Sequence, residues 1–472
     1  MKVTTAKFPE NVKTAIGDKQ LQATLTQLQT GFSLNRTKAI ETLEEFETLR
    51  DQASSIKSHT RANLDAYLEI FEENVHLSGG HVHWCIDDNE ARSKILEICH
   101  TFGATMVTKG KTMVGEEIEI NPFLEKNNIE PIETDLGEYI LQLRNEAPSH
   151  LVAPASHVSK DQITDLFRKT HTQFPLDREL DKPSELLNEA RNTLRTKFLN
   201  ADIGITGANF LIAETGSSII VTNEGNGDLT QTLPQVHIVL ASIEKIVPTL
   251  EDVTTLLRVL ARSATGQEIS SYTTFSTGPK RANDADGPTE FHVVLLDNGR
   301  TDLLASEFSE ILNCIRCGAC LNHCPVYGAI GGHAYGSVYP GPMGAVLTPG
   351  LTGIETSQHL PQASTFCGKC EEVCPVKIPL PDLLRRWRNQ IFKRQLNDLQ
   401  SRWGMGLWAF FAKRPSIYRY AANLKMSLLS VLGKKKGHFN YLPLAKGWVS
   451  NRNMPAPEGR TFQKLWQEKR PK

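Results

Sequence analysis

Seven of the nine cysteines of this chain fall into two groups whose spacing suits iron–sulfur clusters. The first group reads C314-I-R-C-G-A-C-L-N-H-C324-P, and the second reads C367-G-K-C-E-E-V-C374-P. Three cysteines spaced x2 and x2, with a fourth three residues later before proline, form the ligand run of bacterial two-cluster ferredoxins. In that run the fourth cysteine binds the other cluster. The two groups therefore predict two neighbouring cubane clusters.

The ferredoxin pattern divides the seven thiolates into two ligand sets. The predicted ligands are Cys314, Cys317, Cys320 and Cys374 for cluster 1, and Cys324, Cys367 and Cys370 for cluster 2. Two clusters in series indicate electron transfer, because the potential of each cluster depends on its own ligands, nearby charges and solvent exposure.

Cluster 2 is one cysteine short of a full set. A complete second run would have a cysteine three residues before Cys367, where this chain has Ser364. Three outcomes stay open. Ser364, His359 or another non-cysteine group completes a [4Fe-4S] cluster, the fourth iron stays open to water or a partner, or the cluster is [3Fe-4S]. We favour a [4Fe-4S] cluster whose fourth site is weak or open.

Zinc is the main alternative for these cysteines, because Cys-x2-Cys pairs also hold structural zinc. The third cysteine of the first run and the cysteines before proline are redundant for tetrahedral zinc, whereas they all belong to the ferredoxin run. Disulfides are disfavoured, because M1-K-V-T-T-A-K-F-P-E10 has no apolar signal segment. A reducing cytoplasm is therefore the expected compartment.

The charge of the chain is distributed unevenly. The 472 residues, 40% hydrophobic and 22% charged, are typical of a folded protein of about two to four domains, and no apolar run reaches the ~18 residues of a membrane span. From Arg385 onward, 20 Lys and Arg stand against 3 acidic residues, so this segment carries +17 while the whole chain carries −1. The sequence predicts a basic C-terminal extension over residues 385–472.

The basic extension also carries apolar and aromatic residues, as in W403-G-M-G-L-W-A-F-F411. Basic amphipathic helices dock on acidic proteins or on anionic membranes. We favour docking on the acidic body of the same chain or on a partner subunit over nucleic acid, because no nucleic-acid motif accompanies the charge. Peripheral contact with the inner face of the membrane stays open.

The sequence before residue 385 contains three regions with different patterns of secondary structure. Residues 1–60 read as a helical N-terminal arm, with heptad-like patterns such as R36-T-K-A-I-E-T-L-E-E-F-E-T-L-R50. Over residues 61–300, strand-like segments such as V236-H-I-V-L-A241 alternate with helix patterns, which predicts an α/β domain with a largely parallel sheet. Cys85 and Cys99 are interpreted as core residues of this domain. Residues 301–384 are then an α-helical ferredoxin-like domain with the two clusters.

Polar patches in the α/β domain offer the only candidates for catalysis. They supply Lys109, Lys111, Glu116 and Glu224, which could act as a base and a cationic clamp for a carboxylate. Capped or solvated surface carboxylates are a nearly equal interpretation of the glutamates. Neither patch is a P-loop, and no G-x-G-x-x-G follows a strand, so neither a Walker ATPase nor a Rossmann dehydrogenase is indicated.

Several of these motifs together resemble the lactate utilisation protein B family. They include T108-K-G-K-T-M-V-G-E-E-I-E-I-N121, I205-T-G-A-N-F-L-I-A-E-T-G216, N223-E-G-N226, S242-I-E-K-I-V247, the run from Cys314 and C374-P-V-K-I-P-L380. The resemblance covers about residues 60–470. It implies an α/β domain similar in fold to sugar-isomerase and CoA-transferase-like proteins, followed by two [4Fe-4S] clusters on the same seven cysteines.

The resemblance implies an electron-transfer subunit of a three-component system that oxidises L-lactate to pyruvate. Its partners would be lactate utilisation proteins A and C and an unidentified electron acceptor, and the chain itself would be a non-catalytic or co-catalytic component of this oxidoreductase. Two other functions remain as alternatives. One is a stand-alone sugar-phosphate isomerase or acyl-CoA-transferase-like enzyme on the α/β domain, and the other is a zinc-containing binding or assembly protein.

Overall fold

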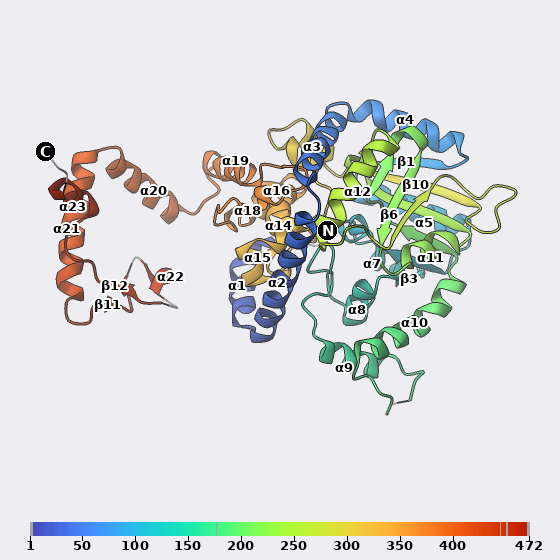
Figure 1. Ribbon diagram of the computed structural model, residues 1–472, viewed down its shortest axis with the longest axis horizontal. Helices are drawn as coiled ribbons and strands as arrows, with labels where there is room; N and C mark the ends of the chain where they lie inside the picture. Colours follow the sequence, from blue (N-terminus) through green and yellow to red (C-terminus); the bar gives the residue numbers. More distant parts are fainter. Residues whose placement is uncertain (1–2, 176, 444, 450–451, 470–472) are drawn as a thin grey trace. The chain divides into compact units, whose positions relative to one another are not determined.

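Two compact units make up the chain, Met1–Ile391 and Phe392–Lys472. The computed structural model describes residues 3–175, 177–443, 445–449 and 452–469. The first unit contains the two larger sheets and all seven cysteines of the predicted clusters, and the second unit is mainly helical, with a two-stranded sheet (Figure 1).

A six-stranded parallel sheet lies at the centre of the first unit, in the order β1-β10-β7-β4-β2-β3 (Figure 1). Its strands are β1 His81–Cys85, β2 Met106–Gly110, β3 Glu130–Glu133, β4 Ile203–Thr206, β7 Val236–Ser242 and β10 Glu290–Leu296. The central strands β4 and β7 are buried along their whole length, as expected where helices cover both faces of a parallel sheet. The predicted α/β domain is thus confirmed.

Side chains alternate between the two faces of β7 and enter two parts of the core. Ile238 packs with helices α5, α6 and α7 on one face, and Val239 packs with α4 on the other. The bounds of these helices are α4 Leu64–Leu77, α5 Asp88–Thr101, α6 Met113–Glu117 and α7 Ile120–Lys126. Cys85 and Cys99 lie in the first part of the core, which confirms their interpretation as core residues.

A second sheet begins where strands β4 and β7 end. Its order is β8-β5-β6-β9, with β5 parallel to β8 and antiparallel to β6, which pairs antiparallel with β9. The strands are β5 Phe210–Ile212, β6 Ser217–Thr222, β8 Ile246–Val247 and β9 Tyr272–Ser276. Because β4 and β7 are parallel, the loops after Thr206 and Ser242 leave the central sheet at the same edge. That carboxyl edge is where ligands bind in open α/β sheets.

Further helices surround the sheets of the first unit. Helices α8, α9 and α10 share a hydrophobic cluster with Ile132 of β3. The bounds are α8 Leu136–Arg144, α9 Lys160–Thr170, α10 Pro183–Asn200, α11 Asn226–Thr232, α12 Leu250–Ala264 and α13 Arg300–Leu304, with short 3-10 turns η2 Ala213–Thr215 and η3 Ile243–Lys245.

The cysteine-rich segment is a series of short helices, as predicted for a ferredoxin-like domain. They are η4 Ser309–Asn313, α14 Ala319–Asn322, α15 Pro325–Ile330, η5 His333–Tyr335, α16 Gly341–Thr352, α17 Ile354–Ser357, η6 Leu360–Gln362, α18 Lys369–Glu372 and α19 Leu380–Lys393. Helix α14 begins after Gly318 and α18 after Gly368, with φ angles of 76° and 81°. Only glycine adopts this left-handed conformation readily, so the Cys-Gly pair of each run fixes the same turn.

The N-terminal helices lie along the cysteine-rich segment. Their bounds are η1 Thr5–Lys7, α1 Phe8–Gly17, α2 Lys19–Glu41 and α3 Phe46–Ala62. Helices α1 and α2 contact α15, and α3 contacts η4 and α12, so the beginning of the chain lies beside residues 309–330 (Figure 1). The predicted helices are therefore present and pack against the cysteine-rich segment, but the stretch 36–50 is not continuous, because α2 ends at Glu41 and α3 begins at Phe46.

The second unit exposes apolar side chains along its helices. Its elements are α20 Leu399–Ala412, α21 Pro415–Gly433, β11 His438–Phe439, α22 Lys446–Val449, β12 Met454–Pro455 and α23 Phe462–Lys469. Helix α20 has no buried residue, and Trp403 and Trp408 are 78% and 61% exposed. None of the helices in the described part of the chain has the length and apolarity needed to cross a membrane.

Candidate metal centre and adjoining pocket

Four predicted ligands of cluster 1 surround one cavity in the first unit. The thiols of the set line it together with Leu151, from the loop after α8, and with apolar side chains of the cysteine-rich segment; the residues are Cys314, Cys317, Cys320, Cys374, Leu151, Ile315, Met343, Val376, Ile378 and Leu380. Among the described residues, no three His, Cys, Asp or Glu side chains converge as a single metal ion would require. A four-iron cube takes its ligands at separate corners, so four thiols spread around an apolar cavity suit it.

The three predicted ligands of cluster 2 are also neighbours. The thiol of Cys370 interacts electrostatically with Cys324 and Cys367, and Cys320 of the first set interacts with Cys370. Burial raises the pKa of Cys370 to about 12 and that of Cys374 to about 11. A cationic centre among these thiols would favour their thiolate form, and the donor set therefore fits an iron–sulfur group.

The two cysteine runs repeat the same backbone turn, and Ser364 stands where the first run has Cys314. The amide of Arg316 donates to Cys314 Sγ at 3.4 Å, and the amide of Phe366 donates to Ser364 Oγ at 3.1 Å. Arg316 and Phe366 both have positive φ angles, 60° and 54°. The side-chain oxygen of Ser364 is thus oriented by the same local contact as the cysteine sulfur of the first run.

Side chains from the N-terminal helices hold the backbone of the cysteine runs. Arg50 donates from Nη2 to the carbonyl oxygens of Cys374 at 2.7 Å and Glu372 at 2.7 Å, and Gln29 donates to the carbonyl oxygen of Cys324 at 2.8 Å. Hydrogen bonds from a charged donor are stronger than those between neutral groups. Helices α2 and α3 therefore help to position the residues that would bind the clusters.

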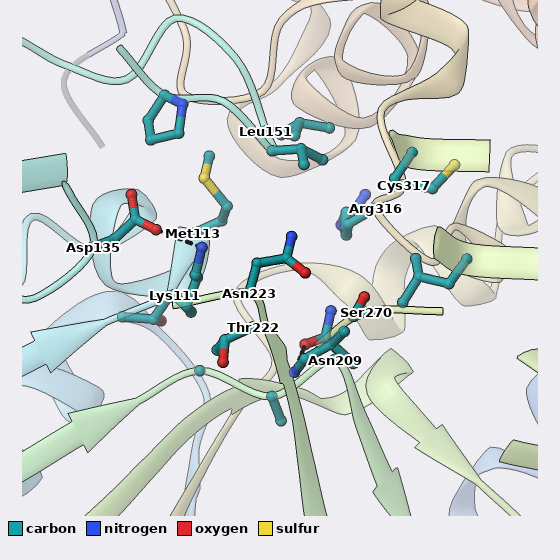
Figure 2. Close-up of a pocket in the computed structure, with 18 of the residues that line it drawn as sticks. Lys111, Met113, Asp135, Leu151, Asn209, Thr222, Asn223, Ser270, Arg316 and Cys317 are labelled. Atoms are coloured by element: carbon teal, nitrogen blue, oxygen red, sulfur yellow. Dashed lines mark hydrogen bonds and ion pairs between the residues drawn. The ribbon is translucent and has the colours of Figure 1, made fainter. Parts of the chain in front are cut away.

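A larger pocket of about 240 Å³ lies at the carboxyl edge of the parallel sheet. Its walls come from the loops after β2, β4 and β7, from strand β6 and from the cysteine-rich segment, and Figure 2 shows Lys111 and Asp135 facing Arg316 and Cys317 across it. Leu151 and Cys317 line both this pocket and the cavity of the first cysteine set. A ligand in the pocket would therefore lie beside a predicted ligand of cluster 1.

A buried ion-pair network connects the sheet to the first cysteine run. Glu244, in η3 after β7, pairs with Arg300 at 2.9 Å and with Arg316 at 2.8 Å. Arg300 also pairs with Glu117 at 2.7 Å, and Glu117 accepts a hydrogen bond from the hydroxyl of Tyr339 at 2.6 Å. Although burial opposes ionisation, the two arginines lower the pKa of Glu244 to about 2. The network fixes Arg316 between Cys314 and Cys317.

The four candidates for catalysis occupy two different places. Lys111 and Glu224 line the pocket, where Lys111 pairs with Asp135 and lies 3.7 Å from Glu224. Lys109 does not line it, because its fully buried ammonium lies between Glu116 at 2.7 Å and Glu133 at 2.7 Å. Burial opposes that charge, yet the two carboxylates raise the pKa of Lys109.

Two further titratable residues of the pocket were not identified from the sequence. Glu138 has a pKa well above its usual range, because neighbouring side chains shield its carboxylate from water and it lies near Glu133 and Asp135. Lys245 lines the pocket from the end of η3. In the sequence, Lys245 stands as a charged residue in S242-I-E-K-I-V247 between two apolar strands, which was the one local signal that it lies at a strand end.

Three family descriptions match successive parts of the chain. Residues 68–296 match the LUD domain, residues 310–378 match the 4Fe-4S dicluster domain, and residues 393–470 match the C-terminal domain of lactate utilisation protein B. A solved structure of a DUF162 family protein from Deinococcus radiodurans is 17% identical, covers 50% of this chain and 98% of that chain, and has a TM-score of 0.25, which is too low to support an inference.

Several relatives that match this chain from end to end carry the same description. Lactate utilization protein B of Bacillus cytotoxicus is 42% identical over 469 residues, which cover 99% of this chain and 98% of that protein. The proteins of the same name from Bacillus licheniformis and Shouchella clausii are 41% and 43% identical, covering 100% and 98% of this chain and 98% and 97% of theirs. With its LUD domain, its dicluster domain and this likeness from end to end, the chain belongs to the lactate utilisation protein B family.

Proposed function

We propose that this chain is the iron–sulfur electron-transfer subunit of a system that oxidises L-lactate to pyruvate. The observation that carries the proposal is the position of Cys317, which lines both the cavity of four thiols and the pocket at the sheet edge. The family is named for lactate utilisation, and the dicluster domain supports iron–sulfur groups on residues 310–378. When bound, such clusters supply one-electron transfer.

The residues of the chain would bind and shield these groups. The first set of four cysteines holds one cluster among apolar side chains such as Leu151 and Met343, which exclude water and so influence its potential. Arg50 holds the backbone at Cys374, and the pair of Arg316 with Glu244 places a compensated charge inside the first run. These residues position the ligands without taking part in bond making.

We further propose that Ser364 supplies the fourth ligand of the second set. Its Oγ accepts from the Phe366 amide as Cys314 Sγ accepts from the Arg316 amide, and the backbone turn that follows is the same in both runs. Oxygen is a weaker ligand than thiolate for iron in a cluster, so the second site would differ in potential from the first. This supports one of the three outcomes that the sequence leaves open.

The second unit would bind the partner proteins. It carries 17 Lys and Arg against 3 acidic residues, and its helix α20 exposes large apolar side chains. A surface of this kind suits a negatively charged partner. Lactate utilisation proteins A and C are the expected partners, and an electron acceptor receives the electrons from the complex.

The test is anaerobic purification with iron, sulfide and EPR measured on the same sample. We expect about eight irons per chain and a signal from interacting clusters after dithionite reduction. Cys317→Ala and Cys370→Ala should each retain about four irons and leave different residual signals, because they belong to different sets. Cys99→Ala, which removes a buried cysteine of the core, is the matched control and should keep all the iron. A preparation with zinc and no iron would overturn the proposal.

A further inference from the structure

Two buried lysines of the first unit have no carboxylate partner among the described residues. Lys57 in α3 is 3% exposed, and Lys245 in η3 is 9% exposed. The Lys57 ammonium donates to the carbonyl oxygens of Glu244 at 2.7 Å and Ile246 at 3.3 Å. The Lys245 ammonium makes no hydrogen bond or ion pair within the described ranges of the chain. Burial lowers the pKa of each lysine to about 8, because a buried ammonium is unfavourable unless it is paired.

The ionised side chains buried around these lysines do not balance their charge. Glu244 pairs with Arg300 at 2.9 Å and with Arg316 at 2.8 Å, and Glu117 pairs with Arg300 at 2.7 Å. Together with the two lysines, this group contains four cations and two carboxylates, which leaves a net charge of +2. Excess buried charge of one sign is stabilised only by a group of the opposite sign nearby. An anion that is not part of the polypeptide would supply it.

The excess positive charge lies beside the first cysteine set. Arg316 stands between Cys314 and Cys317, and its amide donates to Cys314 Sγ at 3.4 Å. Lys245 lines the same pocket as Arg316 and Cys317, and both lysines interact electrostatically with Cys314. The anion that these lysines require would therefore lie at the first cysteine set.

An iron–sulfur cluster on the first set has the required sign of charge. Four thiolates outweigh the positive charge of the iron–sulfur core, so the complete group is an anion, and reduction adds one more negative charge. A positive charge nearby stabilises the reduced form more than the oxidised form. It therefore raises the reduction potential of the cluster.

The surroundings of the second set are different. Cys367 is exposed, and Lys369, which interacts with it electrostatically, is half-exposed and pairs with Glu372 at 2.5 Å. Water and salt screen charges at such positions. The effect of buried lysines should therefore be confined to the first set.

We propose that Lys57 and Lys245 are the counter-charges of cluster 1 and raise its reduction potential. This inference rests on the proposed function, because a cluster must occupy the first set. The reaction concerned is the uptake of one electron from a one-electron donor, in which no covalent bond is made or broken and no proton is transferred. Neither lysine is a ligand, and both act through their electric field. Because cluster 1 borders the pocket, they favour electron uptake on the side of the pocket.

A redox titration of the full, iron-loaded chain tests the proposal, followed by EPR without oxygen and with dithionite as the reductant. The signal of cluster 1 is the one that Cys317→Ala loses. We expect Lys245→Met to make cluster 1 about tenfold harder to reduce, which lowers the potential of a one-electron couple by about 59 mV. Lys57→Met should shift the potential in the same direction. Lys245→Arg keeps the charge and should restore the potential of the wild type, and the potential of cluster 2 should change less than that of cluster 1.

Lys126→Met, which removes an exposed lysine at the end of α7, is the control and should leave both potentials unchanged. Iron content and thermal unfolding are recorded for every variant. If Lys57→Met does not fold, Lys245→Met decides the test, because its ammonium holds no other part of the described chain.

The possible outcomes distinguish this inference from the proposed function. Iron-loaded Lys245→Met with the potential of the wild type would overturn the inference and leave electron transfer intact. An equal shift of both cluster signals would also overturn it, because the lysine would then not act on the first set in particular. Wild-type chain without iron would refute the proposed function, and the inference with it.

Discussion

At the scale of single residues, one histidine is buried within a strand that leads to the pocket. His237 lies within the fully buried strand β7 and its Nε2 bonds with the Thr206 hydroxyl at 2.8 Å, while its Nδ1 has no partner. Burial lowers the pKa of His237 to about 3. The folded chain therefore keeps this imidazole neutral, whereas the unfolded chain protonates it near its usual pKa of about 6.5.

The difference between the pKa of His237 in the folded and the unfolded chain predicts that the folded chain loses stability in acid. Above pH ~6.5 His237 is neutral in both the folded and the unfolded chain, so its contribution to the free energy of unfolding is fully present. As the pH falls from there towards 3, only the unfolded chain gains the proton, and the free energy of unfolding decreases. Between pH 7.5 and 5.5 the loss is about 1.4 kcal/mol. His237→Gln should remove this part of the loss, measured as the change in Tm between the two pH values under argon.

A matched control separates this effect from the general acid lability of the chain. His59→Gln replaces an exposed imidazole of helix α3, and its change in Tm between the two pH values should equal that of the wild type. If His237→Gln loses as much Tm as the wild type does, the neutral state assigned to His237 is wrong.

At the scale of elements, the two cysteine runs are copies of one turn that differ at one ligand position. The sequence alone places Ser364 opposite Cys314 by counting, and the matching amide contacts at Arg316 and Phe366 give that alignment a physical basis. A side-chain oxygen in this position is a hard and weak ligand beside three thiolates. The second cluster should therefore depend on Ser364 for its fourth iron.

Removal of this hydroxyl should convert the second cluster. We expect Ser364→Ala to lower the iron content from about eight to about seven per chain and to give a [3Fe-4S] EPR signal in the oxidised state. Ser364→Cys should keep about eight irons and change the potential of the second cluster, because a different type of ligand then holds its fourth iron. An alanine variant with unchanged iron content and unchanged spectra would show that the fourth iron is open or is bound by another group.

The predictions from the sequence succeeded where the information was local. Spacing identified the cysteine runs, and short apolar segments such as V236-H-I-V-L-A241, alternating with helix patterns, identified the strands. Lys245 was missed because its burial depends on loops that meet only at the sheet edge. Arg50 was missed for the same reason, since it lies 324 residues before the Cys374 carbonyl oxygen that it binds. A contact between residues so far apart in the chain produces no recognisable pattern in the sequence of one polar helix.

At the scale of the whole molecule, the proposed function assigns cluster binding to one compact unit and association with partners to the other. The cysteine sets and the pocket lie within Met1–Ile391, and the basic residues with exposed aromatic side chains lie within Phe392–Lys472. Because the first unit has its own core and all the predicted ligands, a chain that ends at Ile391 should fold and bind clusters.

Truncation after Ile391 should keep about eight irons and weaken assembly with lactate utilisation proteins A and C. In the full chain, replacing Lys434, Lys435 and Lys436 by glutamate should also weaken assembly. Added salt should weaken assembly of the wild type, because screening reduces the attraction between exposed charges. Co-purification and iron analysis of the same samples check both points. Loss of iron on truncation would contradict the separation of roles.

The measurement that tests the central claim most directly is an EPR titration of the complete complex with L-lactate in the absence of oxygen. The account predicts that lactate, in the presence of both co-subunits, produces the reduced-cluster signal of this chain, and that Cys317→Ala loses the part of the signal that belongs to the first set. If the chain is fully loaded with iron and is reduced by dithionite but gives no signal with lactate and both co-subunits, it is not the electron-transfer subunit of lactate oxidation.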